Sequence, residues 1–172
     1  MNTVTFSTLL AAFLLSSCAI QTYQEPIIPA SAMATVTFYN ASAQSTGFQV
    51  FLGENCTQRR LVISPLINIS GLAPKEKKTL TFQAGVPFSF EFNYGISSSY
   101  EMGVLKSEYC QIISTFTPEA GSYRIETSLG TGDCGVAVMK QTNGVWSPID
   151  ANKLLQKRSP NTAFLNDGPW CM

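Results

Sequence analysis

Aromatic residues alternate with small or polar ones between Val86 and Tyr94, and this pattern limits what the chain can fold into. Successive side chains of a β-strand point to opposite faces, so a repeat of two places all the rings on one face. Large rings dominate burial, and we therefore predict the central core strand of a β-sheet protein here. The alternative is an aromatic wall that binds an apolar or sugar ligand. Every second position is aromatic: Phe88, Phe90, Phe92 and Tyr94.

Short runs of the same kind, separated by Gly-, Pro- and Ser-containing turns, continue through the chain from Ala34 onward. Runs of this length and spacing are typical of β-sandwiches. The sequence predicts an all-β fold at residues 34–172: a single antiparallel sandwich of seven to nine strands, Ig-like or transthyretin-like, linked by disulfides. The predicted strands are 36–38, 48–52, 61–63, 79–82, 86–94, 109–116, 122–129, 135–140 and 145–149.

A long loop is expected at Gly95–Ser107, between the predicted strands 86–94 and 109–116. It exceeds the usual hairpin length, and long loops in compact domains often carry function. Its middle mixes aromatic and aliphatic residues, which makes it the first candidate for a contact surface. The alternative is a loop that folds over one end of the sandwich. The candidate contact residues are Tyr100, Met102, Val104 and Leu105.

The N-terminus reads as an export signal. The apolar run Val4–Leu15 is too short to span a bilayer but suits a secretory signal, although no Lys or Arg precedes it. The sequence Leu15-Ser16-Ser17-Cys18 that ends it resembles the lipobox of bacterial lipoproteins. That resemblance implies a signal peptide at residues 1–17, cleavage before Cys18, and fatty acylation of Cys18. The alternative is an ordinary secretory signal that is cut nearby.

The same resemblance implies where the protein is located. In the lipoprotein family, an Asp after the lipidated cysteine tends to retain the protein in the inner membrane, whereas Ala19 follows Cys18 here. We therefore expect a lipid anchor in the outer membrane and a domain that faces the periplasm. Residues 18–33 contain two prolines, which disfavour helix, and are expected to form the lipidated N-terminus and a tether.

Four cysteines besides Cys18 fit two disulfides, because an exported chain meets an oxidising compartment. Four cysteines allow three pairings, which spacing alone does not distinguish. We favour Cys110 with Cys134, which bracket one compact stretch, and Cys56 with Cys171, which would pin the C-terminal tail to an early loop. The stretch from Cys110 to Cys134 also weakly resembles uncharacterised small β-sandwich lipoproteins of bacteria, a group without an assigned activity.

Composition argues against several functional classes. The chain has no His and lacks Ser-x-x-Lys, Gly-x-Ser-x-Gly and phosphate-loop motifs, so no catalytic residue is assigned and we expect no enzyme. The absence of His and of Cys-x-x-Cys pairs argues against a metal, and no cofactor motif is present. Eleven Lys and Arg balance eleven Asp and Glu, which leaves no basic surplus for nucleic acid.

These observations predict a lipid-anchored binding or scaffolding module that acts by protein–protein contact at the membrane. Its expected partners are the membrane, through the lipid on Cys18, and a protein. Some lipoproteins that anchor secretion machines are small transthyretin-like sandwiches, a possibility that no motif selects. The alternative is a small-ligand binder for a sugar, a peptidoglycan fragment or a lipid, using the aromatic strand.

Overall fold

The computed structural model describes residues 22–54, 56, 58–62, 70–101, 104–130, 133–159 and 171. For residues 58, 59, 61, 101, 104–107 and 153 it describes the backbone alone. The predicted signal peptide, Cys18 and Met102 lie outside the described residues. In the part of the chain that is described, nearly all regular structure is β-strand, which confirms the predicted all-β fold.

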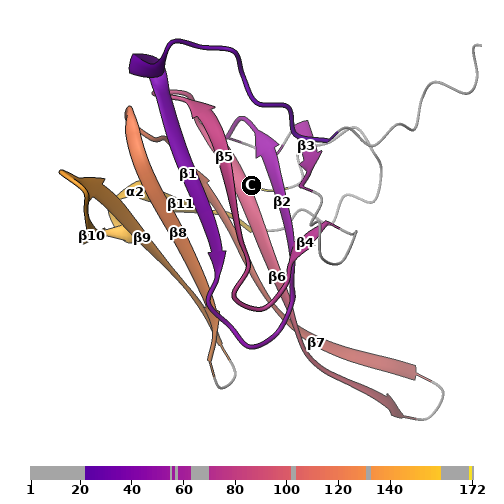
Figure 1. The fold of residues 1–172 in the computed structure, drawn as a ribbon. Helices are drawn as coiled ribbons and strands as arrows, with labels where there is room; N and C mark the ends of the chain where they lie inside the picture. The colour runs from indigo at the N-terminus through magenta and orange to yellow at the C-terminus, as the bar shows by residue number, and fades with distance from the viewer. Residues whose placement is uncertain are drawn as a thin grey trace, which may run out of the picture.

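Two sheets pack face to face (Figure 1). One has the strand order β10-β9-β8-β1-β5, and the other has the order β11-β7-β6-β2-β3, with β4 also paired to β2. The strands are β1 (Met33–Asn40), β2 (Thr46–Leu52), β3 (Gln58–Leu61), β4 (Gly71–Leu72), β5 (Lys77–Gln83), β6 (Phe88–Glu101), β7 (Val104–Phe116), β8 (Gly121–Leu129), β9 (Cys134–Thr142), β10 (Val145–Ile149) and β11 (Leu155–Lys157).

Two details of the predicted sandwich were wrong. The described residues form eleven strands rather than seven to nine. The two unpredicted strands, β4 and β11, have only two and three residues, which is too short to show a periodic pattern in the sequence. The sheets are also not wholly antiparallel, since β1 pairs with β8 in parallel. The chain between these two strands runs through β2 to β7, so no tight turn imposes an antiparallel pairing on them.

The core lies between the sheets and is largely aromatic. Phe38 of β1 is its centre, with its ring centroid 4.7 Å from that of Phe48 and 5.7 Å from that of Phe90. Phe82 of β5 stacks on Phe88 across the two sheets. Tilted and edge-to-face ring pairs of this kind add to the stability that burial supplies.

The C-terminal segment returns to the sandwich. A single helical turn, α2 (Ala151–Leu154), begins after Asp150, whose carboxylate accepts a hydrogen bond from the Asn152 backbone N–H. Such a cap satisfies a donor at the first turn of the helix. β11 follows this turn directly and pairs with β7.

Both favoured disulfides are present. Cys110 of β7 is joined to Cys134 of β9, so this bond ties one sheet to the other. Cys56 is joined to Cys171, which pins the tail as predicted. The second bond is buried on the outer face of the six-stranded sheet with Phe51 and Ile113.

The segment before β1, predicted as a tether, contacts the sandwich through Tyr23. The Tyr23 ring packs 5.2 Å from the Phe82 ring, centroid to centroid, and the Tyr23 hydroxyl donates to the Thr81 backbone carbonyl. A 3-10 turn at Ala30–Ala32 then leads into β1. Prolines predicted an extended course but could not show that Tyr23 belongs to the domain, because one isolated ring has no periodicity.

Candidate functional site

The four alternating aromatic residues belong to the core. Phe88, Phe90, Phe92 and Tyr94 lie on β6, and each is at most 1% exposed. The three phenylalanine rings pack on one another and on Phe38 from the opposite sheet. This confirms the predicted core strand, and it leaves no aromatic wall on β6 for a ligand to stack on.

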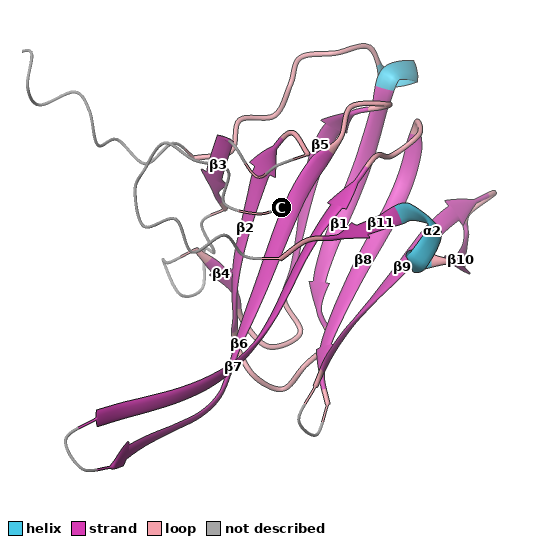
Figure 2. Cartoon of the chain, turned by 180° about the vertical axis from the view of Figure 1, so that it is seen from behind, coloured by secondary structure: helices cyan, strands magenta, loops and turns pink. Residues whose placement is uncertain are grey.

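The strand continues beyond the core, where the sequence predicted a loop. β6 runs to Glu101 and β7 starts at Val104, so the expected loop is a β-hairpin that projects from one end of the sandwich (Figure 2). We call residues Gly95–Glu101 and Val104–Tyr109 the arm. The prediction failed because both faces of the arm lie outside the core, so nothing requires apolar and polar residues to alternate there.

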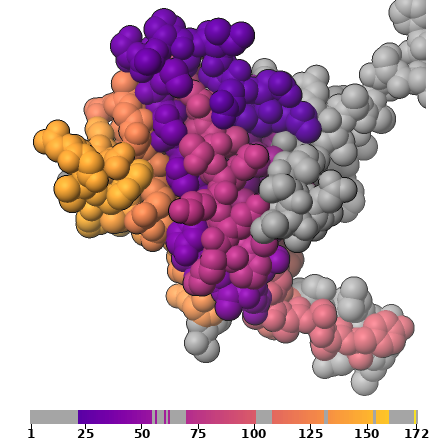
Figure 3. Space-filling model, viewed as in Figure 1, coloured from indigo at the N-terminus to yellow at the C-terminus, as the bar shows by residue number. Residues whose placement is uncertain are grey.

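The candidate contact residues gather at the arm. Tyr100 is 75% exposed, and Val104 and Leu105 begin the returning strand. Tyr100 pairs with Leu105 in the ladder. The fourth candidate, Met102, lies outside the described residues. Tyr109, which the sequence did not single out, is 61% exposed near the base of the arm. The space-filling view shows the arm standing clear of the body (Figure 3).

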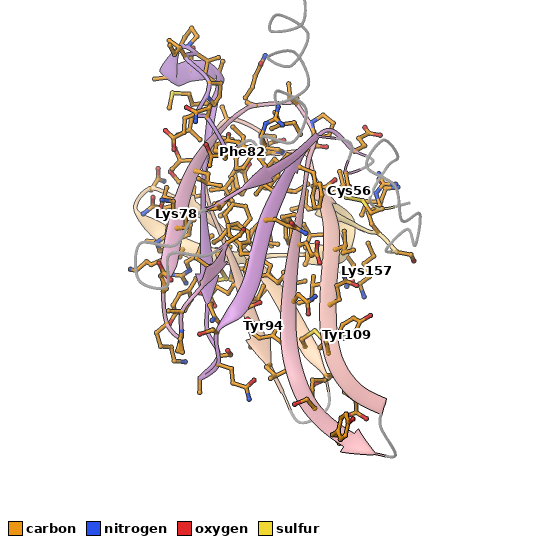
Figure 4. The ribbon with its side chains drawn as sticks, turned by 90° about the vertical axis from the view of Figure 1, so that its right-hand side faces the viewer. Cys56, Lys78, Phe82, Tyr94, Tyr109 and Lys157 are labelled. Atoms are coloured by element: carbon orange, nitrogen blue, oxygen red, sulfur yellow. A yellow bond between two sulfur atoms is a disulfide. The ribbon has the colours of Figure 1, made fainter. Side chains whose placement is uncertain are left out.

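A bulge and a buried hydrogen-bond network mark the base of the arm. The β6–β7 register shifts between Gly95 and Ser97, and such bulges bend a strand and increase its twist. Just before the bulge, the Tyr94 hydroxyl donates to Asn40 Oδ1 at 2.9 Å and lies 2.7 Å from Thr127 Oγ1. Tyr94 and Tyr109 are labelled at this level in Figure 4. The arm therefore starts from a part of β6 that is tied to both sheets.

The outer edge of β7 is open along the arm. β11 pairs with β7 only from Ser114 to Phe116, and one further bond runs from the Arg158 N–H to the Ile113 carbonyl at 2.9 Å. No other described strand pairs with this edge. On the other side of the arm, β2 pairs with β6 only as far as Asn93. Open edges of this kind are templates for a further strand.

An open cleft of about 430 Å³ lies between the edges of β7 and β9, below α2. The Ser114 side chain is 1% exposed there, and its hydroxyl has no hydrogen-bond partner among the described residues. Lys157 is opposite Ser114 in the β7–β11 ladder and lines the same cleft. A buried hydroxyl beside a polar space can be satisfied by bound water, and the lining residues include no carboxylate.

Two ion pairs are seen among the described residues, and both lie at or near the surface. Lys140 Nζ lies 2.7 Å from Glu119 Oε2, and this hydrogen bond lowers the pKa of Glu119 and raises the pKa of Lys140. Arg124 pairs with Glu126 at 2.6 Å and lies 5.1 Å from the centre of the Trp146 ring. Among the described residues, no group of three or more His, Cys, Asp or Glu gathers as metal ligands would.

The described part of the chain contains no helix with the length and hydropathy that a membrane span needs. No family model matches the sequence, and a search of curated proteins likewise finds no match. The functional argument therefore rests on the residues of this chain, and the arm is the candidate site that they define best.

Proposed function

We propose that this protein is a lipid-anchored periplasmic contact module, which binds another protein through the β6–β7 arm. The observation that carries the proposal is the arm itself: Tyr100 and Tyr109 expose large side chains on a ribbon whose outer edges are open. Isolated two-stranded ribbons are marginally stable in water, and exposed edges promote unwanted pairing. We therefore infer that the ribbon serves as a binding element.

The anchor completes the proposal. The sequence Leu15-Ser16-Ser17-Cys18 supports lipidation at Cys18, and Ala19 after it supports placement in the outer membrane. Acylation at the thiol and at the new N-terminus would supply more than one chain, which stable anchoring requires. Labelled palmitate should be incorporated into the full-length protein and should be lost in Cys18→Ser. Retention of the label in that variant would contradict the anchor.

Site-specific photo-crosslinking in cells tests the arm. A photoreactive amino acid in place of Tyr100 should give discrete protein adducts of the full-length chain. Val145 of β10 is the matched control, because it is also exposed (65%) but lies on the far edge of the other sheet. Equal adduct patterns from both positions, or none from Tyr100, would contradict binding through the arm.

The alternative of a small-ligand binder has less support. It relied on the aromatic strand, whose rings are buried in the core. The cleft beside Ser114 is a separate space, and its lining includes none of the four aromatic residues.

A further inference from the structure

The open edge of β7 has a sequence that matches itself. Five residues of the arm read Leu105-Lys106-Ser107-Glu108-Tyr109, so an apolar and a basic residue precede Ser107 and an acidic and an aromatic residue follow it. When two such strands pair antiparallel with Ser107 at the centre, Lys106 of each copy stands opposite Glu108 of the other. We propose that the arm binds the arm of a second copy of this chain through this edge.

The backbone direction agrees with that centre. The Ile113 carbonyl points to the outer edge of β7, because it accepts the hydrogen bond from Arg158. Residues whose backbone N–H and C=O point to the outer edge alternate with residues whose N–H and C=O point to the neighbouring strand. The bulge in the β6–β7 ladder adds its extra residue to β6, so this alternation is unbroken along β7. The N–H and C=O of Ser107 therefore also point outward. They can exchange two hydrogen bonds with Ser107 of the second copy across a two-fold axis.

The same register favours the charged pairs. In an antiparallel ladder, hydrogen-bonded positions alternate with non-hydrogen-bonded positions, whose Cα atoms are closer. With Ser107 at a hydrogen-bonded position, Lys106 and Glu108 meet at the closer type, and the two-fold axis produces this pair twice. Glu108 is exposed and accepts a bond from the Ser97 hydroxyl at 3.0 Å through one of its two carboxylate oxygens.

The apolar positions also match. Leu105 of one copy stands opposite Tyr109 of the other, so pairing covers a ring that is 61% exposed in the single chain. The result is a four-stranded sheet in the order β6-β7-β7-β6, with the two sandwiches at its opposite ends. This inference rests on the proposed use of the arm and names a second copy as its partner.

Cross-linking of the full-length protein in cells tests the centre of the pairing. Hydrogen-bonded antiparallel partners have Cα atoms about 5.5 Å apart, a distance that a disulfide spans. Ser107→Cys should therefore give a dimer on non-reducing gels that disappears with reductant. Ser98→Cys is the matched control, since Ser98 pairs with Ser107 within the arm but would lie roughly 14 Å from its copy. Peptide mapping must show the two native disulfides in both variants.

Charge reversal tests the register independently of cysteine chemistry. Two differently tagged full-length chains are co-expressed and isolated through one tag. Lys106→Glu and Glu108→Lys should each lower self-association on the order of tenfold, because like charges then face each other twice. A mixture of the two variants should associate as well as the unaltered chain, which also shows that both fold. Lys77→Glu, an exposed reversal on β5, should have no effect.

The outcomes separate the two proposals. A Ser107→Cys chain that forms no dimer, or a variant mixture that does not associate, overturns pairing between copies. If the Tyr100 photo-crosslinker still captures a different protein, the contact function stands with another partner. If it captures nothing, both proposals fail together.

Discussion

The Tyr94 hydroxyl donates to Asn40 Oδ1 across the two sheets, at 2.9 Å and without access to solvent. The Asn40 amide in turn donates to the backbone carbonyls of Leu72 and Ala73, at 3.2 and 3.1 Å. Asn40 therefore connects β1, β6 and the turn after β4. Because buried polar groups are costly when unpaired, this network favours one arrangement of the strands at the base of the arm.

Removing the Tyr94 hydroxyl should destabilise the fold. Tyr94→Phe leaves the buried Thr127 hydroxyl without its Tyr94 partner and leaves Asn40 Oδ1 with only the hydrogen bond from the Ser42 N–H. We expect a loss of about 1–3 kcal/mol in the free energy of unfolding. Urea unfolding followed by fluorescence or circular dichroism measures this. Tyr100→Phe is the matched control, since Tyr100 is exposed, and should leave stability unchanged. Equal stability of both variants would show that the network contributes nothing.

Stability should fall at alkaline pH. Burial raises the pKa of Tyr94 and of Tyr23 above the value of about 10 expected in the unfolded chain. Folding thus favours the neutral phenols, so their contribution is fully present below pH 10 and is lost as pH rises through the folded values. The urea midpoint should drop between pH 9 and pH 11.5. The urea midpoint of the double variant Tyr23→Phe, Tyr94→Phe should fall less over this range than that of the unaltered protein. An equal or larger fall would contradict the assignment to these two tyrosines.

Aromatic residues in the core and on the arm should respond differently to truncation. Phe90→Ala removes a fully buried ring and should cost about 3–5 kcal/mol of unfolding free energy. Tyr109→Ala removes an exposed ring and should change stability by less than about 0.5 kcal/mol. Urea unfolding of the two variants separates packing from surface roles. A large cost at Tyr109 would mean that the arm contributes to the fold instead of to contact.

The two disulfides should differ in their effect on stability. The Cys56–Cys171 bond closes a loop with a separation of 115 residues, whereas the Cys110–Cys134 bond closes one of 24. Chain entropy predicts a loss of about 5 kcal/mol for the double Ala variant of the first pair and about 3.5 kcal/mol for that of the second. Unfolding in urea without reductant measures both. The reverse order would show that strain or packing outweighs loop entropy here.

Several strands could be predicted because each has one buried and one solvated face. The alternation in β1, β2 and β6 follows from this arrangement. The Asn143-Gly144 dipeptide, a common sequence in tight hairpin turns, joins β9 to β10. Both residues of that turn have positive φ, which Asn and Gly tolerate best. The disulfide pairing was also anticipated, from the compactness of the stretch between Cys110 and Cys134.

The strands that the sequence did not predict either have no buried face or are only two or three residues long. The arm contains Ser97-Ser98-Ser99, a sequence typical of loops. Its strands are held by backbone pairing, which requires no alternation of apolar and polar residues. β11 is defined only by its ladder with β7. The self-matching order of charges around Ser107 is visible in the sequence, but it has no meaning until the structure shows which edge of β7 is open.

The position of Tyr23 limits how an anchored molecule can stand on a membrane. From Cys18 to Tyr23 the chain can reach at most about 17 Å, far less than a free segment to Met33 would allow. Tyr23 packs near Phe88, where β6 begins, and the arm lies at the other end of that strand, roughly 40 Å away. A single anchored copy can therefore point its arm away from the lipid surface. Two lipidated copies joined arm to arm, as proposed, would carry their anchors at opposite extremes, so on one membrane the pair would have to lie flat along the surface.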